Sequence, residues 1–149
     1  YAANPFDYEE AYVNGEASVA LGGWSATFAY ERLGGDGAIG FSTPLATLHK
    51  FQGFADVFLT TPAAGVEDLN ATAAYGWKGG PFGTEGRVYV IYHDFESERG
   101  DVNFGREVDA GVNLSLGKHW SAEIKGAVYD GRGAFPDRSL IWTSLRFQY

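Results

Sequence analysis

The chain ends with Ile141-Trp142-Thr143-Ser144-Leu145-Arg146-Phe147-Gln148-Tyr149. Residues 141, 145, 147 and 149 are apolar or aromatic, and Ser144, Arg146 and Gln148 alternate with them. Because successive side chains of a strand point to opposite faces, this alternation predicts a β-strand with one apolar and one polar face. A last strand with an apolar face and a terminal aromatic residue is typical of bacterial outer-membrane β-barrels.

Six earlier segments show the same two-residue alternation. They are residues 10–21, 24–31, 68–77, 86–93, 107–116 and 120–129, and the last predicted strand is 139–149. No charged residue falls on the apolar face of these segments, where a Lys or Arg at mid-bilayer would cost about 2–4 kcal/mol. Their lengths lie near the roughly 9–11 residues that a tilted transmembrane strand needs. The pattern therefore predicts an all-β protein, a transmembrane antiparallel β-barrel.

The composition also indicates that, if the chain spans a membrane, it does so as a β-barrel. Hydrophobic residues make up 45% of the chain, yet no apolar run approaches the roughly 18 residues of a membrane helix. Only helices and closed barrels satisfy every backbone polar group in lipid, so a membrane protein of this kind has to be a barrel. The absence of Cys excludes a disulfide framework and a thiolate metal site. The formal net charge of -8 argues against a nucleic-acid partner.

Short and long connections alternate along the chain. The short ones are Gly22-Gly23, residues 78–85 and residues 117–119, and the long ones are about 32–67, 94–106 and 130–138. Outer-membrane barrels have short periplasmic turns and long extracellular loops, so we expect the 32–67 loop to be extracellular.

Aromatic residues near the strand ends predict two membrane-interface belts. Trp24, Trp77 and Trp120 each lie beside a short turn, and Tyr149 ends on the same side; Tyr30 and Tyr92 lie near the long loops.

The strand count predicts that residues 1–149 are one segment of a larger barrel. Counting back from a periplasmic Tyr149 through seven strands places Tyr1 outside, whereas bacterial single-chain barrels have even strand numbers. We therefore expect a preceding N-terminal part. Two further strands within residues 38–60 would keep this parity, and one would instead allow an isolated eight-stranded barrel.

Residues 33–69 hold the most distinctive sequence. They include Leu33-Gly34-Gly35-Asp36-Gly37, the block Gly40-Phe41-Ser42-Thr43-Pro44-Leu45-Ala46-Thr47-Leu48-His49-Lys50-Phe51-Gln52-Gly53-Phe54-Ala55-Asp56, and Thr60-Thr61-Pro62-Ala63-Ala64-Gly65-Val66-Glu67-Asp68-Leu69. Tyr92-His93-Asp94-Phe95 and Leu140-Ile141-Trp142 add to the pattern. Together these stretches closely resemble the C-terminal part of the bacterial alginate export porin family, and the similarity covers essentially the whole chain.

The resemblance implies a location in the bacterial outer membrane and a barrel of about sixteen to eighteen strands. It implies passive passage of a solute or polysaccharide, with no catalysis and no cofactor. The partners it implies are outer-membrane lipid, a small anionic solute or polysaccharide, and a periplasmic export partner.

In the alginate exporter, arginines and lysines line an electropositive constriction. The candidate pore-lining residues of this chain are Arg87, Lys125 and Arg146, together with acidic Glu16, Glu107, Asp109 and Glu123. This mixed lining departs from a strongly basic pore. The acidic residues would shape the field in the lumen, or would only pair with the basic ones across neighbouring strands.

The apolar block 41–58 predicts a loop that folds inward to avoid water. It would constrict the channel, with His49, Lys50, Gln52 and Asp56 facing the solute. The alternative is a loop that packs on the rim for stability.

Three other functions remain open at this stage. A structural or adhesive outer-membrane barrel would have a plugged lumen, and a soluble lipocalin-like barrel would have its aromatic residues inside. A rim enzyme would need a carboxylate–histidine cluster, and the adjacent pair His93-Asp94 does not supply one because the two side chains point to opposite faces. The three His residues show no metal-site spacing, and loop residues Asp36, Asp101, Asp130 and Asp137 do not match an EF-hand.

Overall fold

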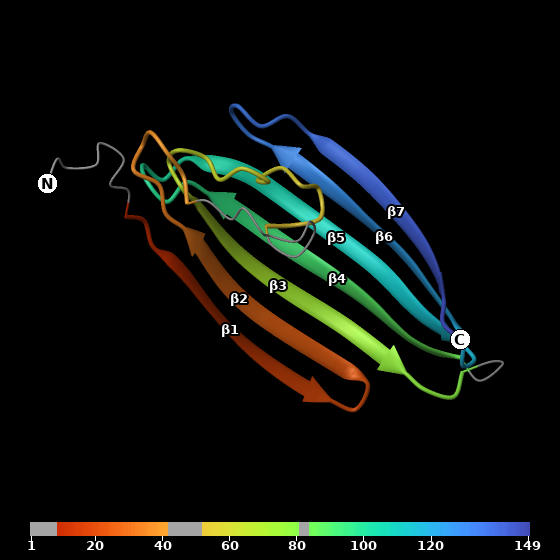
Figure 1. The fold of residues 1–149 in the computed structure, drawn as a ribbon. Coiled ribbons are helices and arrows are strands. Elements are labelled where there is room, and N and C mark those ends of the chain that lie inside the picture. Colours follow the sequence, from red (N-terminus) through yellow and green to blue (C-terminus); the bar gives the residue numbers. More distant parts are fainter. Residues whose placement is uncertain (1–8, 42–51, 81–83) are drawn as a thin grey trace, which may run out of the picture.

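The computed structural model describes residues 9–41, 52–80 and 84–149. Its strands are β1 (Tyr12–Leu21), β2 (Trp24–Leu33), β3 (Val66–Trp77), β4 (Glu85–Glu96), β5 (Asn103–Leu116), β6 (Trp120–Gly131) and β7 (Arg138–Phe147). They form one antiparallel sheet in chain order, from β1 at one edge to β7 at the other (Figure 1). The all-β prediction is therefore confirmed. The sheet formed by these strands is open.

Strands β4 and β5 continue further toward the loops than the alternation predicts. Asp94 on β4 pairs with Arg106 on β5, and a register shift follows between Phe95 and Glu96. Charged residues interrupt the apolar pattern at this level, so the pattern missed the extension. The described parts of residues 38–60 form no additional strand, although Gly35 and Gly40 make an isolated bridge. No helix in the described part of the chain is long and apolar enough to cross a membrane.

The register sorts the strand side chains onto two faces. One face, called the apolar face, carries large hydrophobic side chains from every strand, and they are exposed. Examples are Val19, Phe28, Leu69, Val90, Val108, Ile124, Val128, Ile141 and Leu145. Soluble monomers rarely expose a contiguous apolar surface of this extent, so this face is built to contact something apolar.

The apolar face has a polar boundary at its loop-bearing end and an aromatic boundary at its turn-bearing end. At the loop end, Arg106 lies between Asp94 and Asp130 across β4, β5 and β6, and its Nε is 3.5 Å from Asp94 Oδ1. Asp94, the first residue of the predicted long connection 94–106, belongs to this charged row. Tyr30 lies in the same row of this face, because its partner Leu69 pairs with Asp94, and Tyr92 lies one same-face position closer to the turn-bearing end.

The aromatic boundary includes the three tryptophans that were predicted beside the short turns. The ring of Trp24 is 4.8 Å from that of Tyr75, and the ring of Trp120 is 4.9 Å from that of Phe147. Trp77 follows Tyr75 on the same face of β3, with its ring 6.5 Å away. Tyr149 lies just beyond β7, which ends at Phe147.

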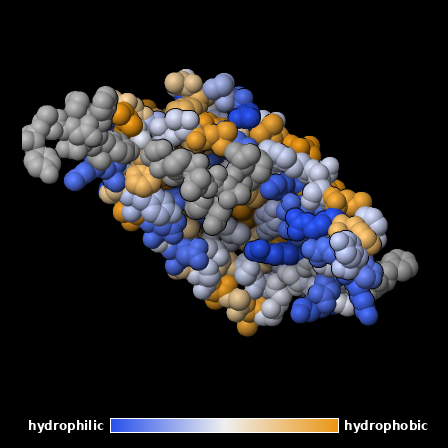
Figure 2. All heavy atoms as spheres, viewed as in Figure 1, coloured by the Kyte–Doolittle hydropathy of each residue, from blue (hydrophilic) through white to orange (hydrophobic). Residues whose placement is uncertain are grey.

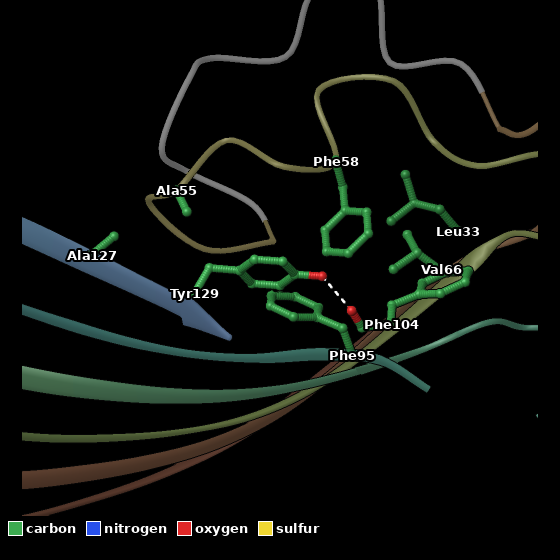
Figure 3. Packing of buried hydrophobic residues seen from close by; sticks show 8 residues of the cluster. All are labelled: Leu33, Ala55, Phe58, Val66, Phe95, Phe104, Ala127 and Tyr129. Atoms are coloured by element: carbon green, nitrogen blue, oxygen red, sulfur yellow. Dashed lines mark hydrogen bonds between the residues drawn. The ribbon is translucent and has the colours of Figure 1, made fainter. Parts of the chain in front are cut away.

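The hydrophobic core lies on the opposite, polar face, under a segment that we call the inner loop, residues 52–65. Figure 1 shows this loop in yellow, passing over the sheet near its loop-bearing end. The core consists of Leu33, Ala55, Phe58, Val66, Phe95, Phe104, Ala127 and Tyr129. Phe58 reaches down from the loop onto Phe95 and Tyr129 (Figure 3). Its ring is 4.8 Å from that of Phe95 and 5.1 Å from that of Phe135.

Candidate functional site on the polar face

The polar face divides into two regions along the strands. The loop-bearing half is covered by the inner loop, which buries a group of ionisable residues that we call the acidic cluster: Glu31, Asp68, His93, Glu107 and Asp109. The turn-bearing half is not covered by any segment among residues 9–41, 52–80 and 84–149. Figure 2, viewed onto the polar face, shows hydrophilic side chains gathered over this uncovered half.

The uncovered half contains a cavity of about 770 Å³, called the turn-end hollow. Three of the predicted pore-lining residues, Arg87, Glu123 and Arg146, line it. Its other polar lining residues include Lys78, Glu85, Asn113, Ser115, Ser121 and Ser144. The register explains this grouping, because Glu123 lies opposite both Asn113 and Ser144, and Arg146 lies opposite Ser121. The hollow therefore combines guanidinium groups with hydroxyl and amide groups that can bind an oxygen-rich solute.

Lys125, also predicted to line the pore, does not line the hollow. Its Nζ lies 4.8 Å from the ring centre of Phe54 in the inner loop and 5.9 Å from that of Trp142. A cation over an aromatic face is attracted by the ring quadrupole, so these contacts place Lys125 at the edge of the inner loop. The structure thus brings Arg87 and Arg146 into one hollow and leaves Lys125 outside it.

His93 occupies the centre of the acidic cluster. Its Nδ1 is 2.9 Å from both carboxylate oxygens of Asp68, and its Nε2 is 3.5 Å from Asp109 Oδ2. The His93 residue is 6% exposed, Asp68 2% and Asp109 0%. A protonated imidazole can donate to both carboxylates at once, so His93 is the natural counter-charge for this buried acidic group.

Glu107 and Asp109 lie on the face that was predicted, but they do not face an open lumen. The inner loop covers both, because its backbone N–H groups need acceptors when they are buried. The amide of Phe54 donates to Asp109 Oδ2 at 3.0 Å, and the amide of Ala55 donates to Glu107 Oε1 at 2.7 Å. The prediction that Glu107 and Asp109 line an open pore is therefore corrected. In this structure both carboxyl groups anchor the inner loop.

Gly53 allows the inner loop to approach Glu107 this closely. Its φ is +80°, and a Cβ at this position would lie 2.6 Å from Glu107 Cδ. Only glycine adopts this backbone conformation without strain and leaves room for the carboxyl group.

The four loop residues predicted to constrict a channel have different outcomes. His49 and Lys50 lie outside the described residues. Gln52 Nε2 donates to Glu31 Oε2 at 2.5 Å, and Glu31 also accepts the Tyr12 hydroxyl at 2.7 Å. The carbonyl oxygen of Asp56 accepts a hydrogen bond from Arg138 Nη1 at 3.1 Å. Gln52 and Asp56 therefore tie the loop to β2 and β7.

Glu16, the remaining acidic candidate, lies away from the turn-end hollow. It lines a smaller pocket of about 340 Å³ between the inner loop and strands β1 to β4. Asn14, Asn70 and Thr72 line the same pocket.

The acidic cluster is the carboxylate–histidine grouping that sequence reasoning did not find. The adjacent pair His93-Asp94 was rightly set aside, because Asp94 lies on the other face with Arg106. Asp68 and Asp109, from the two strands that flank β4, complete the cluster instead. Alternation alone places all three side chains on the polar face, but their contacts depend on strand register, which the long loop 94–106 leaves undetermined.

Loop carboxylates are bound within their own turns. The amides of Ala38 and Ile39 each donate to Asp36 Oδ1 at 2.7 Å, and these hydrogen bonds lower the pKa of the Asp36 carboxyl from its ordinary value. Asp130 pairs with Arg132 at 2.9 Å, and Asp137 accepts the amide of Gly131 at 2.9 Å. Across residues 9–41, 52–80 and 84–149, no three or more His, Cys, Asp or Glu side chains are grouped so as to hold a metal ion.

Comparison with protein-family models, with curated proteins and with solved structures finds no match for this chain. The alginate export porin family therefore remains a prediction that rests on the residues quoted above.

Proposed function

We propose that residues 1–149 are the C-terminal part of a bacterial outer-membrane β-barrel channel. The channel would pass anionic sugars, polysaccharide or other small solutes by passive diffusion. The observation that carries this proposal is the contrast between the two faces of one sheet. An exposed apolar face lies behind a polar face whose open half contains Arg87 and Arg146.

The dimensions of the apolar face support a membrane location. On β5 the apolar residues run from Val108 to Leu116, which is close to the roughly 9–11 residues of a tilted membrane-crossing strand. The tryptophans at the turn end and the charged row at the loop end correspond to the two limits of a lipid-facing band. A soluble lipocalin-like barrel would need the reverse arrangement, with the apolar side chains enclosed.

The turn-end hollow supports selection of anionic groups. Two guanidinium groups can bind carboxylates by paired hydrogen bonds, and the serines and Asn113 can bind sugar hydroxyls. Glu85 and Glu123 moderate the positive charge, as a mixed lining does in a wide pore.

Adjacent residues of β5 provide a matched test of the membrane face. Val112→Arg places a charge on the apolar face and should cost about 2–4 kcal/mol near mid-bilayer. Asn113→Arg places the same charge on the polar face and should cost less than about 1 kcal/mol. The measurement is the free energy of unfolding of the natively purified protein in lipid vesicles. Equal losses for the two variants would contradict the assignment of the faces.

Selectivity is tested by Arg87→Gln combined with Arg146→Gln. A unit charge at 4 Å is worth about 1 kcal/mol in water, so the anion-to-cation permeability ratio should fall roughly fivefold per residue at closest contact. The measurement is the reversal potential in a planar bilayer under a salt gradient. Arg132→Gln, which removes a guanidinium from the loop after β6, is the control. An unchanged reversal potential in the double variant would show that permeating ions do not pass through the turn-end hollow.

A structural or adhesive barrel with a plugged lumen is the second candidate. The inner loop favours it, because this loop covers the loop-bearing half of the polar face. It predicts no conductance after verified insertion, whereas the channel proposal predicts a steady conductance. Block of that conductance by added polyuronate would favour a polysaccharide, and absence of block would favour smaller solutes.

A further inference from the structure

We propose that the inner loop is a proton-dependent constriction, docked on the barrel wall while Glu107 and Asp109 share one proton and released when that proton is lost. The role as a constriction rests on the proposed channel function. The docking itself rests only on contacts between the loop and the sheet.

The hydrogen-bond count at the docking site shows why a proton is needed. Glu107 and Asp109 are 0% exposed, and the loop supplies one backbone N–H to each. The second oxygen of each carboxyl, Glu107 Oε2 and Asp109 Oδ1, is buried and has no donor among the described groups. A buried carboxylate oxygen without a donor is costly, so an ionised pair would be poorly satisfied under the loop.

One proton shared by the two carboxyl groups supplies the missing hydrogen bond. Glu107 and Asp109 are two residues apart on the same face of β5 and accept the adjacent amides of Ala55 and Phe54, so their carboxyl groups lie side by side under the loop. Two carboxyl groups at this distance cannot both ionise easily, because their charges repel in a site shielded from water. When one of them is protonated, it donates to the other, and both still accept the loop amides.

The surrounding groups cannot replace that proton. Below the loop, Tyr12, Glu31, Asp68 and Tyr129 are neutral or acidic. Among the described residues, His93 is the one basic member of the cluster, and it approaches Asp109 at Oδ2 rather than at the unpaired Oδ1. Lys125 contacts the ring of Phe54, and Arg138 binds the carbonyl of Asp56, so these two cations hold the loop without touching the carboxyl pair.

The direction of the response follows from this arrangement. Raising the pH removes the shared proton, and the two adjacent anions are then stabilised by water, which requires the loop to lift. Lowering the pH does not release the loop, because a protonated carboxyl still accepts an amide N–H through its carbonyl oxygen.

The test uses the natively purified protein with a spin label on Leu59→Cys. The chain has no other cysteine, and Leu59 is 59% exposed next to the anchoring Phe58. Between about pH 6 and about pH 10, a range that spans shifted carboxyl and imidazole titrations, the label should become mobile and the conductance should rise. In the Glu107→Gln background, the mobility of the label and the conductance should both stay at their pH 6 values across this range. Gln is neutral, accepts the Ala55 amide and can donate to Asp109.

Asp109→Asn likewise leaves one neutral amide beside one carboxyl group, with the roles of the two positions exchanged, so it should also remove the pH response. Glu96→Gln removes a carboxyl from the opposite face of β4 and should respond as the unaltered protein does. The proposal is overturned if Glu107→Gln and Asp109→Asn both keep the transition, or if the label in the unaltered sequence stays immobile at high pH. If the label responds to pH but the inserted protein shows no conductance, the proton-dependent docking is supported and the channel function is contradicted. Conductance that stays constant while the label responds would overturn the role as a constriction.

Discussion

Phe58→Ala is expected to lower the free energy of unfolding by about 3–5 kcal/mol, the usual cost of removing a buried Phe ring. Phe58 is 5% exposed, and its ring contacts four others: Phe95, Phe104, Tyr129 and Phe135. These rings come from β4, β5, β6 and the loop before β7, so one side chain of the inner loop fills the centre of the core. The cavity left by alanine cannot close, because the backbone of the sheet beneath it is fixed by strand pairing.

The matched control for this prediction is the neighbouring residue. Leu59 is 59% exposed, so Leu59→Ala should change the free energy of unfolding by less than about 1 kcal/mol. Urea titration in lipid vesicles measures both values. Phe58→Ala should also increase the conductance of the inserted protein, because the loop loses its main apolar contact. If Phe58→Ala costs no more than Leu59→Ala, the ring cluster does not hold the loop on the sheet.

The strands could be predicted because each follows a simple alternation. On β5, Val108, Ala110 and Val112 alternate with Asp109 and Asn113, and the structure places the two sets on opposite faces. The prediction ended too early on β4 and β5, because Asp94 and Arg106 form an ion pair on the otherwise apolar face and break the pattern. Ladder hydrogen bonds continue past such a pair, and composition gives no sign of this.

The site was predictable only in part, and for a physical reason. Arg87, Glu123 and Arg146 meet in the turn-end hollow because alternation places all three on the polar face and each lies within four residues of the turn-bearing end of its strand. The acidic cluster forms at the other end, and its contact between His93 and Asp109 depends on the register between β4 and β5, which the long loop 94–106 does not set. The burial of Glu107 and Asp109 depends on the inner loop, whose position follows from side-chain packing rather than from any local pattern.

The two ends of the polar face therefore differ in what a solute could reach. At the turn end, guanidinium and hydroxyl groups line an open hollow, whereas at the loop end four carboxyl groups are covered by 14 residues of chain, 52–65. A charge-selective path along this face would consequently depend on the arginines of the hollow. The acidic residues would influence it only when the inner loop lifts. On the proposed channel function, the stability of the acidic cluster would therefore decide whether a solute reaches these carboxyl groups.

His93→Leu is expected to lower the free energy of unfolding by about 3–5 kcal/mol, because removing one partner of a buried ion pair leaves uncompensated charge. His93 is 6% exposed and links Asp68 on β3 to Asp109 on β5, so leucine would leave two buried carboxyl groups without this partner. Leucine fills a similar volume, so packing loss contributes little, and the effect reports mainly on charge and hydrogen bonding. Urea titration in lipid vesicles measures the loss.

Two further variants separate this interpretation from a general effect of replacing histidine. His119 is exposed in the turn before β6, where its Nδ1 lies 2.9 Å from the carbonyl oxygen of Gln148. His119→Leu should therefore cost less than about 1 kcal/mol. His93→Gln restores a hydrogen-bond donor without a charge, so it should recover part of the stability lost in His93→Leu. If His93→Leu is no more costly than His119→Leu, the imidazole does not stabilise Asp68 and Asp109, and the carboxyl groups of the cluster must be held neutral by protons alone.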